Sequence, residues 1–359
     1  MKPNQIRIPR WVDRHFHPRM GNMLKLVLPY TLRQQAQAGV IMGNHGEGKE
    51  TSTIAKTVPR IKEVRRCLKE HGYLRKFTPI FTCYLTDDLS VAELVEGFRH
   101  DYWRAVKVYL ADKKGEGGTT NSQHGVRDLK GRYRLFAAME KFGIPLLGHW
   151  EAPEEGADEF DREKISIERD LAPIRKRFPD LRIVVEHLTT KDAADFVNEA
   201  GDNTYATVTS QHLMLNRNAL FRGGLCPQHW CKPVLKREYH RLAVRKYVTS
   251  GHLRFGAGTD SAPHDKEKKS LPCGCAAGIF SAVDAVELYA TVFDEDGATE
   301  FYGNFMSSNF ISIYGLDVSD EGMLIERAPF AVPETVGSKA AGKVIVFKGG
   351  ETLPWRLVA

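Results

Sequence analysis

The chain has 359 residues, of which 42% are hydrophobic and 27% are charged, as is usual for a globular protein. This length allows one large domain or two average ones with a full core, and six scattered cysteines do not predict a disulfide framework. The net charge of +6 is small for the length, and no run of lysine or arginine resembles a nucleic-acid-binding arm. We therefore expect no nucleic-acid partner.

The sequence also predicts no targeting or membrane segment. Residues 1–10 lack the apolar core of a signal peptide, and no run reaches the ~18 apolar residues of a membrane span. We expect a reduced, cytoplasmic location and no membrane partner.

Strand-like runs alternate with helix-like stretches along the chain. The first predicted strand covers the apolar run 8–12 and the polar residues after it, ending at His17. Further strands are predicted at residues 38–42, 77–85, 104–110, 144–149, 181–186, within 205–215, and at 253–258. Helices are predicted at residues 50–71, 91–100, 127–142, 160–178, 191–199, 238–250, 284–294 and 299–314.

Two irregular stretches interrupt this alternation, and a third segment follows it. Residues 111–125 are rich in glycine and charge without periodicity, which predicts a mobile surface loop. Residues 217–237 form a long excursion, and residues 343–359 predict an extra strand or hairpin outside the main fold.

Eight strand-like runs with mostly helical connections predict an α/β fold, the (β/α)8 TIM barrel. We expect one domain over residues 1–359, with residues 343–359 as a small C-terminal extension. A doubly wound open sheet shares the alternation, but no G-x-G-x-x-G motif opens a helix after a strand.

Polar residues stand where the predicted strands end, and a barrel gathers its chemistry at those ends. They are His15 and His17 on the first strand, Lys107 within the fourth, His149 and His187 ending the fifth and sixth, and Asp260 after the eighth. Singly, each has a structural explanation, such as a hydrogen-bonded core histidine or a lysine that snorkels outward. Together they favour a common site.

Four imidazoles and a carboxylate are ligands suited to Zn²⁺ or a similar divalent ion. A protonated lysine is a poor ligand, but Lys107 would become a bidentate anionic bridge if its amine carried CO₂ as a carbamate. Two bridged metals ~3.5–4 Å apart hold a hydroxide between them and lower its pKa. Asp260 could then bond one metal while receiving the proton of that hydroxide.

The chain resembles the class II dihydroorotases of the amidohydrolase superfamily in motifs that keep the family's order. These are HFHPR at 15–19, MLKLVLPYT at 23–31, CYLTD at 83–87, KVY at 107–109, TTNSQHGV at 119–126, EHLTTKDAADFV at 186–197, QHLMLNRN at 211–218, GTDSAPH at 258–264 and CGCAAG at 273–278. The resemblance implies zinc-dependent, reversible cyclisation of N-carbamoyl-L-aspartate to L-dihydroorotate in pyrimidine biosynthesis, by a homodimer.

The resemblance also implies roles for individual residues. The implied metal ligands are His15, His17 and Asp260 for the more buried Zn²⁺, His149 and His187 for a second Zn²⁺, and carboxylated Lys107 (N6-carboxylysine), which with a hydroxide bridges the two. The implied substrate contacts are Arg19, Asn44 and His264 for the carboxylate, Thr119 and Thr120 on a lid loop at 111–125, and the backbone around Lys232 and Ala276 for the ring. Asp260 is the implied general acid and base.

The sequence departs from the family's pattern around this pocket, without losing an implied ligand. The departures are Met20, Gly43, Lys232, the extra residues 113–118, and Trp150, which we expect to narrow the mouth.

Three functions remain open at this stage. The first is dihydroorotase, and the second is a paralogue that acts on another carboxylated cyclic amide or imide, such as a hydantoin-like ring. The third is a silent scaffold, which the intact ligand set opposes. Cys273 and Cys275 predict a reduced turn rather than a metal or redox pair.

Overall fold

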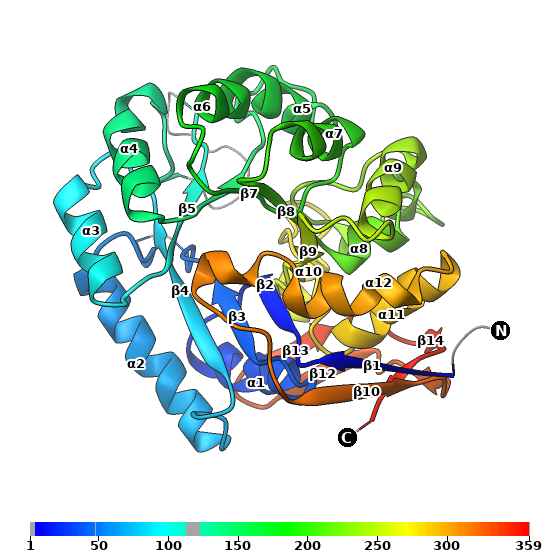
Figure 1. Cartoon of the computed structure of the whole chain (residues 1–359). Coiled ribbons are helices and arrows are strands. Elements are labelled where there is room, and N and C mark those ends of the chain that lie inside the picture. The colour runs from blue at the N-terminus through cyan, green and yellow to red at the C-terminus, as the bar shows by residue number, and fades with distance from the viewer. Residues whose placement is uncertain (1–3, 47, 113–122, 359) are drawn as a thin grey trace.

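Eight parallel strands form a barrel in the computed structural model, which describes residues 4–46, 48–112 and 123–358 (Figure 1). The strands are β2 (Val12–Phe16), β3 (Ala38–Ile41), β4 (Thr78–Tyr84), β5 (Ala105–Tyr109), β6 (Leu146–His149), β7 (Ile183–Val185), β8 (Thr204–Val208) and β9 (Phe255–Ala257). Each is hydrogen-bonded to the next in chain order. This order confirms the predicted (β/α)8 barrel and excludes a doubly wound sheet, whose strand order reverses.

Helices surround the barrel and fill most connections between its strands (Figure 1). They are α1 (Gly21–Arg33), α2 (Ile54–Glu70), α3 (Val91–Arg99), α4 (Tyr133–Phe142), α5 (Arg162–Ser166), α6 (Ala172–Arg177), α7 (Lys191–Glu199), α8 (Ser210–Met214), α9 (Glu238–Val248), α10 (Lys266–Lys269), α11 (Ala285–Glu295) and α12 (Thr299–Gly303). The prediction lacks α1, whose apolar face contains Pro29. Within the described part of the chain, no helix has the length and apolar character needed to cross a membrane.

The first predicted strand is two strands in the structure. Pro9 ends β1 (Gln5–Pro9), which lies outside the barrel and pairs antiparallel with β10 (Gly322–Glu326). The barrel strand β2 starts only at Val12, so His15 lies within it and His17 follows its end.

The C-terminal part of the chain adds short antiparallel strands outside the barrel. They are β11 (Phe330–Ala331), β12 (Thr335–Ser338), β13 (Gly342–Ile345), β14 (Thr352–Leu353) and β15 (Arg356–Leu357). β15 joins the β1–β10 sheet, whereas β13 pairs with β12 and β14 with β11. Residues 343–359 thus contribute to three small sheets rather than forming one hairpin.

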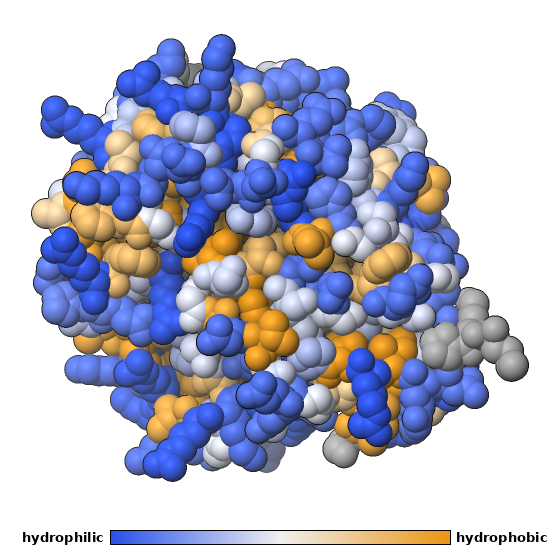
Figure 2. Space-filling view, in the orientation of Figure 1, coloured by the Kyte–Doolittle hydropathy of each residue, from blue (hydrophilic) through white to orange (hydrophobic). Residues whose placement is uncertain are grey.

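The segment 299–314, predicted as helical, is helical in the structure but not one continuous helix, because the chain bends inward after Ser308 to close one end of the barrel. Helix α12 ends at Gly303, a π-helical turn follows over Asn304–Ser308, and Phe310 has a left-handed φ of 43°. Phe310 and Tyr314 pack against the first residues of the barrel strands, including Val12 and Ala38. Figure 2 shows hydrophobic residues exposed near the centre of this face, over the barrel.

The barrel closes between its first and last strands at their carboxyl ends. The amide of Asp260 donates to the His15 carbonyl at 2.8 Å, and the amide of His17 donates to the Ser261 carbonyl at 3.0 Å. The Asp13 carboxylate accepts from the amide and hydroxyl of Thr259 at 2.9 and 2.7 Å. This closure places Asp260 beside the two histidines of β2.

Candidate metal centre

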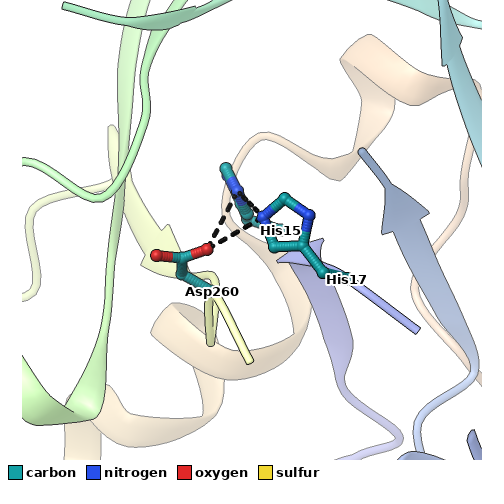
Figure 3. A group of neighbouring side chains, drawn as sticks. All are labelled: His15, His17 and Asp260. Atoms are coloured by element: carbon teal, nitrogen blue, oxygen red, sulfur yellow. Dashed lines mark hydrogen bonds and ion pairs between the residues drawn. The ribbon is translucent and has the colours of Figure 1, made fainter. Parts of the chain in front are cut away.

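Three donor atoms converge at the closing point of the barrel. His15 Nε2 and His17 Nε2 are 3.3 Å apart, and Asp260 Oδ1 lies 3.4 Å and 3.0 Å from them respectively. Figure 3 shows the two imidazoles and the carboxylate pointing at one another from β2 and from the segment after β9. All three side chains are buried, and together they form a possible metal site. Two imidazoles and a carboxylate are donors that suit Zn²⁺ or a similar divalent ion.

A carboxylate missed by the sequence analysis orients His15. Glu186, the last residue before His187, accepts from His15 Nδ1 at 2.6 Å and from the Thr207 hydroxyl at 2.6 Å. This contact leaves Nε2 of His15 free to face the site, as in carboxylate–histidine–metal arrangements. Burial lowers the pKa of His15, but the Glu186 and Asp260 carboxylates together outweigh it and the net pKa is raised.

His149 and His187 form a second pair on the neighbouring strand ends. His149 Nδ1 lies 3.1 Å from His187 Nε2, and His149 Nε2 lies 2.7 Å from the buried carboxylate of Glu151. Burial lowers the pKa of both histidines, that of His187 well below its ordinary value. Neutral imidazoles are the form that binds metals. Glu151 was not predicted, because its position two residues after His149 does not show that its side chain turns toward the imidazole.

Lys107 lies on β5, fully buried, and its Nζ has no hydrogen-bond partner in the described structure. The ammonium stands 5.0 Å from the centre of the Tyr109 ring. Burial lowers its pKa to about 8. A buried ammonium without a partner is unfavourable. The environment of Lys107 therefore suits a lysine whose amine is carboxylated and so becomes able to bind a metal.

Arg19 is held in a left-handed conformation, φ 58°, directly after the first ligands. Its Nε donates to the Pro263 carbonyl at 2.9 Å, and its Nη2 lies 3.0 Å from His264 Nε2. Arg60 of α2 donates to the Arg19 carbonyl, and its partner Glu63 accepts from the Gly21 amide at 2.7 Å. This support from α2 was not predicted. Residues in strained left-handed backbone cluster at functional sites, and His187 and Asp260 share this conformation.

One pocket joins most of these groups. It is lined by His17, Arg19, Asn44, Tyr109, His149, His187, Lys232, Asp260, Ala262, Ala277 and Gly278. Asn44 Oδ1 has no hydrogen-bond partner in the described structure, and Lys232 Nζ donates to Glu159. His264 and Ala276 lie next to the pocket: His264 Nε2 is 2.9 Å from the Ala277 carbonyl, and the Ala276 carbonyl accepts from Lys269. Thr119, Thr120 and residues 113–118 fall outside the described residues.

The expected narrowing of the mouth by Trp150 is wrong. Trp150 is 2% exposed and is not among the residues that line the pocket. Its ring lies against Gly148, where an added Cβ would come within 2.1 Å of the indole. Gly148 and Trp150 are therefore a packing pair, in which the missing side chain makes room for the large one. Met20 lies at the surface, 38% exposed, as the residue preceding α1.

Gly43 is also explained by packing. A Cβ at this position would lie 2.5 Å from Thr51 Oγ1 and 3.1 Å from Tyr84 Cβ. Only glycine lets the chain before Asn44 pass so close to Thr51. The departure at Gly43 therefore preserves the position of Asn44 rather than changing the pocket chemistry.

Comparison with known proteins gives full-length matches. No protein-family model matches the chain. A dihydroorotase of Yersinia enterocolitica is 43% identical over 359 residues, which cover 100% of this chain and 99% of that protein. A dihydroorotase of Erythrobacter litoralis is 43% identical, with 98% of each chain covered.

Solved structures give the same result. The dihydroorotase of Saccharomyces cerevisiae in complex with 5-fluoroorotic acid superposes with a TM-score of 0.89 at 27% identity, covering 99% of both chains. That of Campylobacter jejuni gives 0.86 at 28% identity, covering 100% of this chain and 99% of the other. A Thermus D-hydantoinase, at 16% identity and a TM-score of 0.71 over 99% of this chain and 83% of its own, shares the fold. With relatives 43% identical over essentially its whole length, the chain belongs to the dihydroorotase family.

Proposed function

We propose that this protein is a class II dihydroorotase, which interconverts N-carbamoyl-L-aspartate and L-dihydroorotate in de novo pyrimidine biosynthesis. The observation that carries the proposal is a single pocket lined by Arg19, His17, His149, His187 and Asp260. This pocket contains a guanidinium, which suits a substrate carboxylate. It also contains nitrogen and oxygen donors, which suit divalent metals. The full-length relatives support the same reaction.

Two Zn²⁺ ions, or other divalent ions, fit the donors of this chain. His15, His17 and Asp260 would hold one ion, His149 and His187 the other, and Lys107, carboxylated on Nζ, would bridge them. Such a pair of metals lowers the pKa of a bound water and polarises a carbonyl oxygen. Neutral His17, His149 and His187 suit this role, since burial lowers the pKa of each.

The remaining pocket residues position the substrate. The Arg19 guanidinium, with Asn44 and His264 beside it, receives the carboxylate of dihydroorotate through charge-assisted hydrogen bonds. The backbone near Lys232 and Ala276 borders the ring, and Thr119 and Thr120 on the loop 111–125 close over it. Fixing one end of the substrate brings its amide carbon to the nucleophilic water, which is the entropic part of the catalysis.

Asp260 moves the proton. Its Oδ1 faces His15 and His17, so we assign Oδ2 as the atom that takes a proton from the attacking water. The same oxygen returns the proton to the ring nitrogen as the amide bond breaks, giving N-carbamoyl-aspartate. Ring closure is the reverse, with Asp260 as acid and base in the opposite order.

We further propose the setting in which this enzyme works. It acts in the cytoplasm as a homodimer with a small-molecule substrate. Residues 1–359 form a single amidohydrolase domain, with residues 111–125 as the lid and 343–359 as its extension.

The direct test is an assay of the purified protein for both directions of the reaction at several pH values, with and without chelator. We expect the balance between the two directions to shift from hydrolysis toward cyclisation as pH falls. Chelator should abolish the reaction in both directions. A protein that holds two metals per chain but converts neither compound would refute the proposal. That result would favour a paralogue acting on another carboxylated cyclic amide, for which the Lys232 ammonium on the pocket wall is the observation in favour.

A further inference from the structure

A buried charge cluster lies behind the second histidine pair and is not explained by the roles assigned so far. Glu151 is 0% exposed and Lys236 is 3% exposed. Lys236 Nζ lies 3.9 Å from Glu151 Oε1, and neither atom has a hydrogen-bond partner in the described structure. The two buried charges depend on each other, because removing the ammonium would leave Glu151 Oε1 without its counter-charge.

Glu151 connects this cluster to His149. Its other oxygen, Oε2, accepts from His149 Nε2 at 2.7 Å. That contact fixes the tautomer with the proton on Nε2, so Nδ1 turns toward His187. An anionic partner on the far nitrogen both orients an imidazole and raises its strength as a ligand. Glu151 therefore contacts His149 through one carboxylate oxygen and Lys236 through the other.

A second buried carboxylate supports the segment after His187. Glu163 of α5 accepts from the amides of Thr189 and Thr190 at 2.9 and 2.6 Å. Burial raises the pKa of Glu163, and the positive charge of Lys236 opposes that rise. Glu163 thereby holds the backbone that leaves His187, whose φ of 39° needs such support.

We propose that Lys236 is a positioning residue for the second metal: its buried ammonium is the counter-charge of Glu151, which orients His149. The proposal rests on the binuclear centre described under the proposed function. Lys236 touches neither substrate nor metal. It acts through Glu151, and in the described structure no hydrogen bond or ion pair joins it to His15, His17 or Asp260.

The experiment measures metal binding rather than turnover. Apo protein is titrated with Zn²⁺ against a chromophoric chelator, which resolves a tighter and a weaker ion per chain. In Lys236→Met we expect the affinity for one ion to fall about 10–100-fold, the usual effect of losing a partner of a metal ligand, while the other is unchanged. Arg175→Met is the matched control. Arg175 is a buried cation that bonds the Leu181 carbonyl, just before the start of β7, and its loss should lower stability without changing either affinity.

Glu151→Gln and the double variant complete the test. Since Lys236 acts through Glu151, the double variant should lose little more affinity than the more affected single variant. Additive losses, an equal loss at both sites, or unchanged binding in Lys236→Met would overturn the proposal. If Lys236→Met does not fold, Glu151→Gln decides the inference, and it must lower the affinity for one Zn²⁺ ion only. Wild-type protein that binds a single ion would instead refute the binuclear centre itself.

Discussion

Lys107 is a buried amine with no hydrogen-bond partner in the described structure, and its positive charge acts to lower the pKa of His15, His149 and His187. We predict that Lys107→Ala loses the anionic bridge, so that less than the full complement of metal remains bound and activity falls to near background. Short carboxylic acids should restore part of the activity by occupying the place of the carbamate. Metal analysis and an assay with and without added acid check this. A variant with full metal content and undiminished turnover would show that Lys107 forms no bridge.

In the proposed mechanism, Asp260 provides a metal-ligand atom and also transfers the proton. Asp260→Ala should abolish turnover, a loss of at least roughly 10²–10⁴-fold for the acid–base role alone, while most of the fold persists. Circular dichroism and thermal unfolding report the fold. Asp284→Ala, which removes another buried carboxyl at the start of α11, is the control and should keep its activity. Substantial residual activity in the Asp260 variant would exclude its general acid–base role.

The six proposed ligands were predictable from the sequence for a geometric reason. Parallel strands of a barrel end at one mouth, so polar residues at strand ends meet there whatever their separation in the chain. The residues behind them were not predictable. Whether Glu151 faces His149, or Glu186 faces His15, depends on side-chain packing that strand periodicity does not encode.

Helix α2 supports the substrate site through one ion pair at its inner face. Arg60 donates to the Arg19 carbonyl, and Glu63 bonds both Arg60 and the Gly21 amide. We predict that Arg60→Met frees the strained backbone of Arg19, raising KM for dihydroorotate about 10-fold or more with a smaller change in kcat, since positioning is lost but the reacting groups are not.

Steady-state kinetics of the Arg60 variant should be compared with those of Arg66→Met. Arg66 is exposed on the same helix, and its loss should change neither constant. A loss in kcat alone for Arg60→Met would assign Arg60 to the chemistry rather than to positioning.

Elements with a clear apolar period were predicted well, and those shaped by tertiary contacts were not. The helix predicted at residues 191–199 matches α7, where Thr190 caps the first turn and one face is buried. The region 299–314 has helical spacing, yet it bends at Phe310 because the open end of the barrel must be filled. The short strands β10, β11 and β12 were not predicted, since two- to five-residue strands carry too few alternations to detect, whereas β14, β15 and most of β13 lie within the segment 343–359 that was predicted as an extra strand or hairpin.

The stability of the whole molecule depends on a buried acid far from the pocket. Glu287 of α11 is 4% exposed, its Oε2 has no hydrogen-bond partner in the described structure, and burial raises its pKa to about 7. Its folded-state pKa exceeds the unfolded value of 4.5, so its contribution is fully present below pH 4.5 and is lost as pH rises through 7.

We predict that Glu287→Gln is more stable than the wild type at pH 8, by on the order of 3 kcal/mol at most, with a much smaller difference near pH 5. Urea unfolding at both pH values measures this. Glu300→Gln, an exposed acid on α12, should show no pH-dependent difference. An equal effect of Glu287→Gln at both pH values would mean that Glu287 stays ionised throughout.

Metal removal should also weaken the fold, because the ligands come from strands on opposite sides of the barrel. An ion present at 100 times its Kd stabilises the native state by about 2.7 kcal/mol. Chelation should therefore lower the Tm by several degrees, and added Zn²⁺ should reverse the shift. Calorimetry with and without chelator checks this, and an unchanged Tm would mean that no ion binds the folded protein.

The pairing of Asp13 with Thr259 joins residues 246 positions apart, at the point where the barrel also gathers His15, His17 and Asp260. Contacts so distant in the chain form late in folding, because the loop between them must first be ordered. The first ion therefore cannot bind before the last strand has docked. The rate of metal uptake after dilution from denaturant would thus report when the barrel is completed. A fragment ending before β9 would have His15 and His17 without the Asp260 carboxylate.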